Sequence, residues 1–227
     1  MILYCIPTPL GGTLREALPA PAITTIRSIG DFAVENAKSA RAFLGALDMP
    51  VRELNIMVIG EAKDPLAPLR EKRSLGLLSE AGCPAIADPG AQLVEQAHRE
   101  GFKVVPLIGP SSIVLALMAS GLEGQRFAFC GYLPREAPAR KKRIEELERR
   151  SRSEKETQIF IETPYRNEAL LEALLSTCAS TTLLCVAADL TLATEKVAVK
   201  TIGEWRREAE PVGRRPAVFL LLANGAR

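Results

Sequence analysis

Residues 79–91, with the sequence SEAGCPAIADPGA, decide how this chain folds. They follow a short apolar run at residues 74–78 and precede a segment with helical periodicity at residues 92–100. Two prolines and two glycines among these thirteen residues exclude a continuing strand or helix. The segment is therefore a loop that leaves the end of a strand and leads into a helix, the connection typical of α/β proteins.

Two other loops have the same character. PTPLGG at residues 7–12 follows a predicted strand, and LIGPSS at residues 107–112 follows another and leads into an apolar helix. In parallel α/β sheets ligands bind where the loops gather, at the carboxyl ends of the strands. Glycine lets the backbone approach a ligand, proline reduces the entropy lost on ordering, and Ser111 and Ser112 can cap the helix while offering a hydroxyl. The three loops predict a binding site, although each by itself is also consistent with a structural turn.

The residues of these loops limit the classes of ligand that the site could bind. The chain contains neither the G-x-x-x-x-G-K-[ST] pattern of a P-loop nor G-x-G-x-x-G after a strand, and none of the three loops contains a lysine. Their main-chain groups and apolar side chains suit a ligand such as an adenine nucleoside.

Composition excludes some classes of protein and leaves others open. The 227 residues carry a net charge of +2, which neither requires nor excludes an RNA partner. One histidine, and five cysteines without C-x-x-C spacing, argue against a metal site or a disulfide framework. No apolar stretch is long enough to span a membrane. We expect a cytoplasmic protein that binds neither metal nor membrane.

The alternation of strand-like and helix-like segments predicts an α/β protein with two α/β domains. Two glycines at residues 121–125 interrupt the pattern, so we expect an N-terminal domain at residues 1–120, mainly parallel, and a C-terminal domain at residues 121–227 with a mixed sheet. Strands are predicted at residues 2–6, 31–34, 74–78, 103–107, 127–130, 158–161, 183–188, 197–202 and 217–222. Helices are predicted at residues 22–28, 37–47, 92–100, 112–119, 139–152, 168–176 and 203–208.

Five motifs together point to a known family. They are PTPLGG, SEAGCPAIADPGA, VVPLIGPSS, RFAFCGYLP and IFIETPYR, the last ending at Arg166. In order and spacing the chain resembles the tetrapyrrole methylase superfamily from Leu3 to Leu222. Within it, the chain is similar to the branch of bacterial small-subunit ribosomal RNA 2′-O-ribose methyltransferases.

The resemblance implies S-adenosyl-L-methionine as methyl donor, S-adenosyl-L-homocysteine as product, a cofactor cleft between the two domains, and a homodimer. Within the motifs it implies cofactor contacts from the loops and from the C-terminal domain. These residues are Pro9, Leu10, Gly11, Ser79, Glu80, Ala81, Gly82, Ser111, Ser112, Ile113, Glu162, Pro216 and Ala217.

Three departures from the RNA-methylating branch leave the substrate open. Where those enzymes carry a run like E-D-T-R, this chain has VENAK, in which only Glu35 matches. Where they carry E-S-x-H-R, this chain has ETPYR, with Tyr165 in place of the histidine. They often continue with a helical C-terminal extension beyond the point where this chain stops, so we expect a short form.

The leading hypothesis is a methyltransferase acting on an RNA ribose hydroxyl, with Glu35 as the candidate base. Alternatives are a tetrapyrrole (porphyrin or corrin) methyltransferase and a non-catalytic S-adenosylmethionine-binding module. The residues Arg140–Arg143 are candidates for phosphate contacts, or one face of a solvated helix. Glu162 is read alternatively as a structural ion pair with Arg166. Tyr132 and Tyr165 either line a substrate site or pack in the ordinary way.

Overall fold

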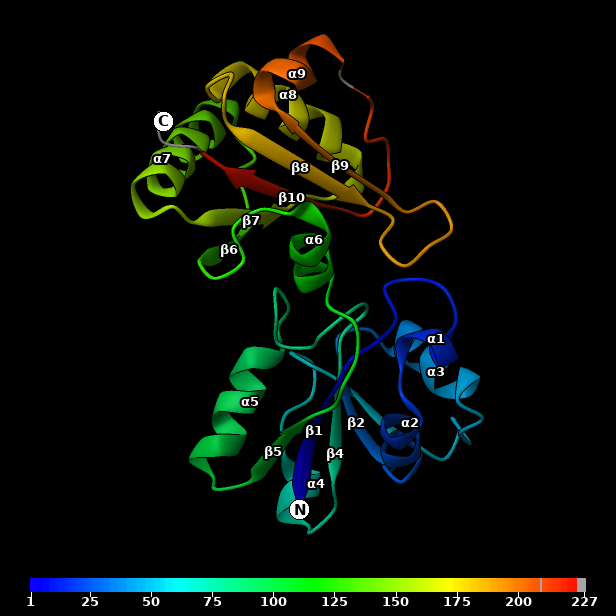
Figure 1. The fold of residues 1–227 in the computed structure, drawn as a ribbon. Coiled ribbons are helices and arrows are strands. Elements are labelled where there is room, and N and C mark those ends of the chain that lie inside the picture. Colours follow the sequence, from blue (N-terminus) through cyan, green and yellow to red (C-terminus); the bar gives the residue numbers. More distant parts are fainter. Residues whose placement is uncertain (209, 224–227) are drawn as a thin grey trace. The chain divides into compact units, whose positions relative to one another are not determined.

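The computed structural model describes residues 1–208 and 210–223 (Figure 1). The chain forms two compact units, unit 1 from Met1 to Ser111 and unit 2 from Ser112 onward. The division lies one helix before the glycine-containing segment at residues 121–125, because helix α6, Ser112–Ser120, packs against strands of unit 2. Residues 224–227, which the sequence assigned to the second domain, lie outside the described residues.

Unit 1 contains a five-stranded sheet with the order β3-β2-β4-β1-β5. Every neighbouring pair in it is parallel, as the sequence predicts for this half of the chain. The strands are β1 (Ile2–Ile6), β2 (Asp31–Val34), β3 (Asn55–Val58), β4 (Leu75–Leu78) and β5 (Lys103–Pro106). The helices are α1 (Leu14–Ala17), α2 (Ala20–Arg27), α3 (Ala37–Ala46), α4 (Ala67–Arg70) and α5 (Gly90–Arg99).

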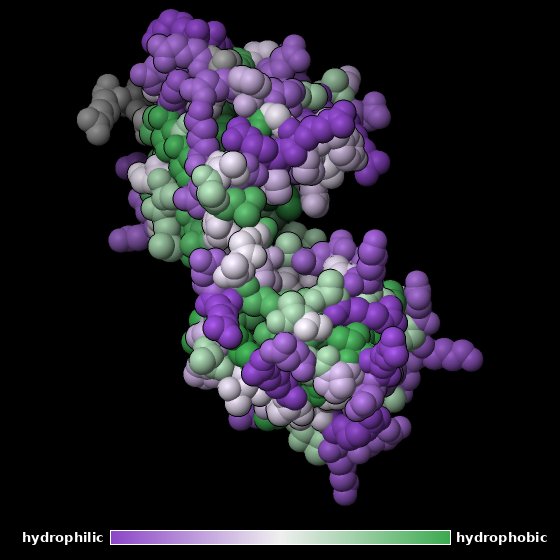
Figure 2. All heavy atoms as spheres, turned by 90° about the vertical axis from the view of Figure 1, so that its right-hand side faces the viewer, coloured by the Kyte–Doolittle hydropathy of each residue, from purple (hydrophilic) through white to green (hydrophobic). Residues whose placement is uncertain are grey.

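Helices cover both faces of this sheet (Figure 1). Phe32 and Leu44 belong to the cluster under α2 and α3, whereas Leu77 and Leu93 belong to the cluster under α4 and α5. The central strand β4 is buried along its whole length, which is why its sequence is a continuous apolar run without alternation. On the molecular surface, Figure 2 shows hydrophilic residues over most of the visible face and hydrophobic residues in patches.

Strand β3 is missing from the sequence prediction. It is an edge strand of only four residues, NIMV, and all four are at least partly exposed. Its pairing with β2 runs from Asn55 opposite Asp31 to Val58 opposite Val34. An edge strand with one neighbour lacks the long apolar run by which β4 is recognised, so the sequence signal is weak.

The described part of unit 2 forms a five-stranded mixed sheet with the order β6-β7-β10-β8-β9. Only β6 and β7 are parallel, and the other pairs are antiparallel, which confirms the predicted mixed sheet. The strands are β6 (Phe127–Tyr132), β7 (Thr157–Ile161), β8 (Leu183–Ala188), β9 (Lys196–Thr201) and β10 (Ala217–Leu222). With α6, the helical segments are α7 (Ala137–Glu154), η1 (Pro164–Arg166), α8 (Asn167–Thr177) and α9 (Ile202–Arg207).

The core of unit 2 lies between its sheet and the helices α7, α8 and α9. Phe160 of β7 stacks on Phe219 of β10, with ring centroids 6.1 Å apart. Trp205 of α9 is buried in this core and donates its indole N–H to the Leu184 carbonyl at 2.9 Å, so it fastens α9 to β8. Helix α6 packs on the strands β8, β9 and β10, and Figure 1 shows it on the side of the sheet opposite α8 and α9.

The five cysteines are all free thiols in the structure. Burial raises the pKa of the Cys178 and Cys185 thiols to about 12, which keeps them protonated and inert at neutral pH. Among residues 1–208 and 210–223 no group of histidine, cysteine, aspartate and glutamate is arranged to hold a metal ion. No helix in the same ranges is long and apolar enough to cross a bilayer.

Gly76, in the middle of β4, offers a test of packing in unit 1. A Cβ at this position would lie 2.7 Å from Cδ1 of Ile6 and 2.7 Å from Cδ1 of Phe32. We expect Gly76→Ala to lower the free energy of unfolding by about 1–3 kcal/mol through overpacking, measured by urea denaturation. The control is Gly30→Ala, whose Cβ would meet nothing within 4 Å and which should leave the midpoint close to wild type. Equal midpoints for the two variants would contradict the tight packing around β4.

Candidate functional site

The parallel sheet of unit 1 brings the carboxyl ends of β1, β2, β4 and β5 to one edge, and the three loops identified in the sequence leave from there. The first two loops are joined by main-chain hydrogen bonds. The Thr8 N–H donates to the Gly82 carbonyl at 2.9 Å, and the Gly82 N–H donates to the Thr8 carbonyl at 3.0 Å. These bonds connect two loops that lie far apart in the sequence.

The third loop joins the same cluster. The thiol of Cys83 donates to the Pro110 carbonyl at 3.4 Å. A Cβ on Gly109 would lie 2.4 Å from Cβ of Pro7, so only glycine fits between the first and third loops. A Cβ on Gly82 would lie 3.2 Å from Cδ2 of Leu10, and the φ of +77° at Gly82 is a conformation that favours glycine. These contacts explain the small residues in the loops.

Residues 85–90 form a tight turn around one carboxylate. Oδ1 of Asp88 accepts the N–H of Ala85 at 2.6 Å and the N–H of Gly90 at 3.1 Å. Ala85 and Ala87 have positive φ values of 66° and 63°, each of which costs on the order of 1–3 kcal/mol for a residue other than glycine. The proline-rich sequence and the Asp88 bonds thus hold the backbone in a strained form, and such strain clusters at ligand sites.

Glu35 lies at the same edge, directly after β2. Its N–H donates to the Leu78 carbonyl at 3.2 Å, and its Oε2 accepts the N–H of Glu80 at 3.3 Å. Burial raises the pKa of the Glu35 carboxyl, the Glu80 N–H opposes this, and the charges of Asp88 and Glu80 raise it further. A carboxyl group whose pKa lies above its ordinary value, beside loops of this kind, suits a proton acceptor.

The structure therefore gathers at one edge of unit 1 all the predicted site residues of that unit. They are Pro9, Leu10, Gly11, Glu35, Ser79, Glu80, Ala81, Gly82 and Ser111. Asp88 lies in the motif at residues 79–91. Its role in holding the loop has a sequence signal, because an aspartate two residues before a glycine in a proline-containing segment is typical of a side-chain-capped turn.

In unit 2 the predicted residues fall into two places. Ser112 and Ile113 begin α6, which covers a face of the sheet. Glu162 follows β7, and Pro216 and Ala217 lead into β10, which runs antiparallel to β7 from Val218 opposite Ile161. Glu162 and Ala217 therefore share one edge of the mixed sheet.

Glu162 forms the structural ion pair that the sequence offered as an alternative. Its Oε1 accepts the Thr163 N–H at 2.7 Å and pairs closely with the Arg166 guanidinium. Only 1% of the Glu162 side chain and 18% of the Arg166 side chain are exposed. Its Oε2 is buried and has no hydrogen-bond partner among the described residues. The Glu162 carboxylate thus stabilises the turn after β7 through Oε1, and Oε2 is left as an acceptor without a donor among the described residues.

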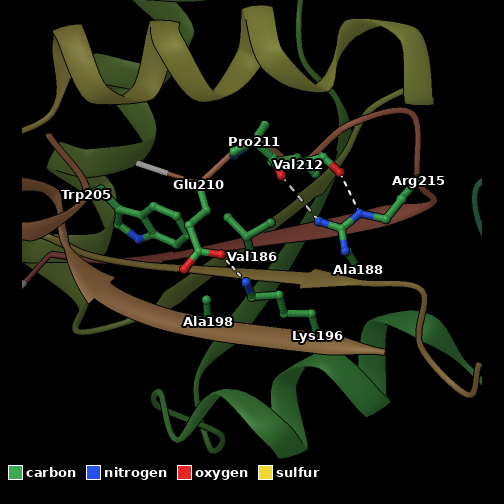
Figure 3. Close-up of a pocket in the computed structure, with 9 residues that line it drawn as sticks. All are labelled: Val186, Ala188, Lys196, Ala198, Trp205, Glu210, Pro211, Val212 and Arg215. Atoms are coloured by element: carbon green, nitrogen blue, oxygen red, sulfur yellow. Dashed lines mark hydrogen bonds and ion pairs between the residues drawn. The ribbon is translucent and has the colours of Figure 1, made fainter. Parts of the chain in front are cut away.

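A small pocket lies on the α9 side of the mixed sheet, between β8, β9 and the segment at residues 210–215 (Figure 3). Lys196 reaches across its mouth to pair with Glu210, and Arg215 turns back to donate to the carbonyls of Val212 and Pro211. The cations that line this pocket are therefore engaged by the chain itself. It contains none of the predicted site residues.

Comparison with known proteins identifies the family to which the chain belongs. Residues 51–205 match the family model described as Tetrapyrrole (Corrin/Porphyrin) Methylases. The chain belongs to the tetrapyrrole methylase family. It is a methyltransferase, and methyltransferases of this family use S-adenosyl-L-methionine.

Relatives extend the match over the whole chain. A protein of Halalkalibacterium halodurans named Ribosomal RNA small subunit methyltransferase I is 33% identical over 98% of this chain and 75% of its own length. Proteins of the same name from Vibrio cholerae and Escherichia coli O157:H7 are 32% and 30% identical, over 100% and 98% of this chain.

Solved structures show the same fold at lower identity. Uroporphyrin-III-C-methyltransferase from Thermus thermophilus has a TM-score of 0.58 at 20% identity and covers 97% of this chain and 94% of its own. The methyltransferase CobJ has a TM-score of 0.62 at 19% identity and covers 100% of this chain and 95% of its own.

The loop cluster of this methyltransferase fits S-adenosylmethionine. The cofactor carries a neutral nucleoside and a sulfonium that gains from nearby carboxylates, and the cluster has Glu35 and Asp88 and no lysine. Gly82 and Gly109 let the three loops pack against one another, because a Cβ at these positions would meet Leu10 and Pro7.

Gly82 provides a test of the loop cluster. We expect Gly82→Val to weaken binding of S-adenosylhomocysteine about tenfold or more in isothermal titration calorimetry, because the branched side chain forces the loop away from Leu10. The control is Gly101→Val, which has the same φ of +77° but lies in the turn before β5, with nothing within 4 Å of its Cβ. If Gly82→Val folds and binds with wild-type affinity, the cluster is not the cofactor site.

Proposed function

We propose that this protein transfers the methyl group of S-adenosylmethionine to a ribose 2′-hydroxyl of small-subunit ribosomal RNA. One observation carries the choice of substrate. The three relatives described above, which match this chain along 98–100% of its length at 30–33% identity, carry the name Ribosomal RNA small subunit methyltransferase I. The solved structures named for tetrapyrrole chemistry are only 19–20% identical and support the fold alone.

We further propose that the predicted residues of both units hold the cofactor. In unit 1 the bonds between Thr8 and Gly82 and between Cys83 and Pro110 support this, because they present three loops as one surface. In unit 2 the unmatched Oε2 of Glu162 supports it, since a buried acceptor without a donor is costly unless a ligand supplies one. The residues are Pro9, Leu10, Gly11, Ser79, Glu80, Ala81, Gly82, Ser111, Ser112, Ile113, Glu162, Pro216 and Ala217.

When bound, S-adenosylmethionine supplies an electrophilic methyl group on a sulfonium. Transfer would join the methyl carbon to the hydroxyl oxygen and leave neutral S-adenosylhomocysteine, and it would require a residue of the protein to accept the hydroxyl proton. The protein contributes mainly by holding the two reactants in line, which the strained and mutually bonded loops favour by limiting loop motion.

Glu35 is proposed to take the released proton. Its carboxyl is fixed by the N–H of Glu80, and Oε1 of the Glu80 side chain accepts a hydrogen bond from the Ser39 hydroxyl at 3.3 Å. The raised pKa makes the ionised group a stronger base than an ordinary glutamate.

Methyl transfer to purified small ribosomal subunits tests the proposal. We expect label from S-adenosylmethionine to enter the RNA with wild-type protein, and Glu35→Gln to lower the rate about 10²- to 10⁴-fold without changing affinity for the cofactor. The control is Glu53→Gln, which makes the same charge change on the exposed surface before β3. Label in a uroporphyrinogen-type acceptor and none in the subunits would instead assign a tetrapyrrole substrate. Cofactor binding with no transfer to either would favour the binding-module alternative.

The pH dependence of the reaction tests the role of Glu35. A carboxyl group accepts a proton only when ionised, so kcat/KM should rise as the pH passes through the pKa of Glu35. Because burial raises that pKa, the acidic limb should lie above the value of about 4.3 for an unperturbed glutamate. Glu35→Gln should remove this limb while keeping its residual rate. A limb of the same position in the variant would show that another group titrates.

The homodimer stays a prediction from the resemblance, and the cytoplasmic location stays a prediction from the composition. Exposed apolar side chains on α6 and β9, Val114, Met118 and Val199, would be compatible with a partner surface in unit 2. A substrate assembled into ribosomal subunits would place the activity in the cytoplasm.

A further inference from the structure

Two tyrosines of unit 2 are far more exposed than packing residues. Tyr132 is 54% exposed and Tyr165 is 66% exposed. Tyr132 ends strand β6 opposite Ile161, the last residue of the adjacent parallel strand β7. Tyr165 follows four residues later. Both side chains therefore leave the same edge of the mixed sheet, and ordinary packing does not account for them.

A β-bulge sets the direction of Tyr132. Phe129 pairs with Ile159, but the next pair is Tyr132 with Ile161, so β6 has one more residue than β7 between the two pairs. Gly131 in this interval has a φ of +65° and nothing within 4 Å of the position of a Cβ. A bulge with a left-handed glycine re-aims the following side chain. The alternation of the strand is broken here and the aromatic ring is turned toward solvent.

The turn that carries Tyr165 is held rigidly from inside. The buried carboxylate of Glu162 binds the Thr163 N–H and the Arg166 guanidinium, and Nε of Arg166 donates to the Thr163 hydroxyl at 3.0 Å. The Arg166 guanidinium carbon also lies 5.7 Å from the centre of the Tyr165 ring. The ring is thus presented in a fixed place, so little entropy is lost when something stacks on it.

Arginine and lysine residues follow Tyr132 in the sequence. Arg135 lies three residues after Tyr132 and is exposed, with no carboxylate paired to it within residues 1–208 and 210–223. Its carbonyl accepts a hydrogen bond from Nη1 of Arg140 at 3.2 Å, which places the basic run Arg140–Arg143 of α7 next to the same loop. Exposed aromatic rings with arginines alongside are the features by which proteins hold unpaired nucleotides.

We propose that Tyr132 and Tyr165 form a stacking platform for unpaired bases of the RNA substrate, with Arg135 contacting an adjacent phosphate. The inference rests on the proposed function, since it assigns to the RNA a binding surface in unit 2. Stacking needs only the faces of the rings, whereas the tyrosine hydroxyls are dispensable. The bulge at Gly131 and the turn fixed by Glu162 are the structural means by which two neighbouring strands present these rings.

The decisive experiment compares leucine with phenylalanine at both positions. Leucine keeps an apolar side chain but removes the aromatic face, and phenylalanine keeps the face but removes the hydroxyl. With small ribosomal subunits, we expect Tyr132→Leu and Tyr165→Leu each to lower kcat/KM about 5- to 150-fold, mainly through KM, and the phenylalanine variants to stay near wild type. Phe127→Leu is the control, because Phe127 is 45% exposed at the other end of β6.

Salt dependence separates stacking from charge. The tyrosine variants should bind subunit RNA more weakly with an unchanged slope of log affinity against log salt, whereas Arg135→Gln should reduce the slope by about 1. Leucine variants with wild-type kcat/KM on subunits that the wild-type protein methylates would overturn the platform and leave the proposed function intact. Absence of any methylation of subunits by the wild-type protein, or transfer only to a tetrapyrrole, would overturn both.

Discussion

The parallel pairing of β1, β2, β4 and β5 is the constraint on which the rest of unit 1 depends. Parallel strands all end at the same edge, so loops separated by tens of residues in sequence are delivered to one place. The pairing is possible because both faces of β4 are covered by helices, and the glycine in its centre lets Ile6 and Phe32 close over it. Once the strands are paired, Thr8 and Gly82 meet, and the bonds between them complete the site.

Glu35 shows how burial and hydrogen bonding act against each other at that edge. Burial favours the neutral carboxyl, while the Glu80 N–H favours the ionised one. Burial dominates, so the pKa rises, yet the bond fixes the direction in which the carboxylate points. A carboxylate held in one orientation suits the proposed removal of a proton from a weakly acidic hydroxyl.

Unit 2 uses a buried ion pair for a different purpose. Removing one partner of a buried pair leaves an uncompensated charge and costs about 3–5 kcal/mol, so Glu162 and Arg166 are needed to keep the turn after β7 in place. This turn also carries the exposed side chain of Tyr165. The interior of the unit therefore determines which aromatic ring is offered to a substrate, through a contact that is itself hidden from solvent.

The sequence by itself determined the α/β class, most of the strands and the longer helices of both halves, and the three loops whose glycines and prolines predict a ligand site. These features are local, because the preferences of glycine, proline and apolar runs act over a few residues. Only the tertiary structure decided that β3 forms an edge, that α6 belongs to unit 2, and that Gly82 faces Leu10 and Thr8. It also turned Tyr132 outward through a bulge. Those outcomes depend on strand register and on contacts between distant segments, and no short stretch of sequence contains both partners.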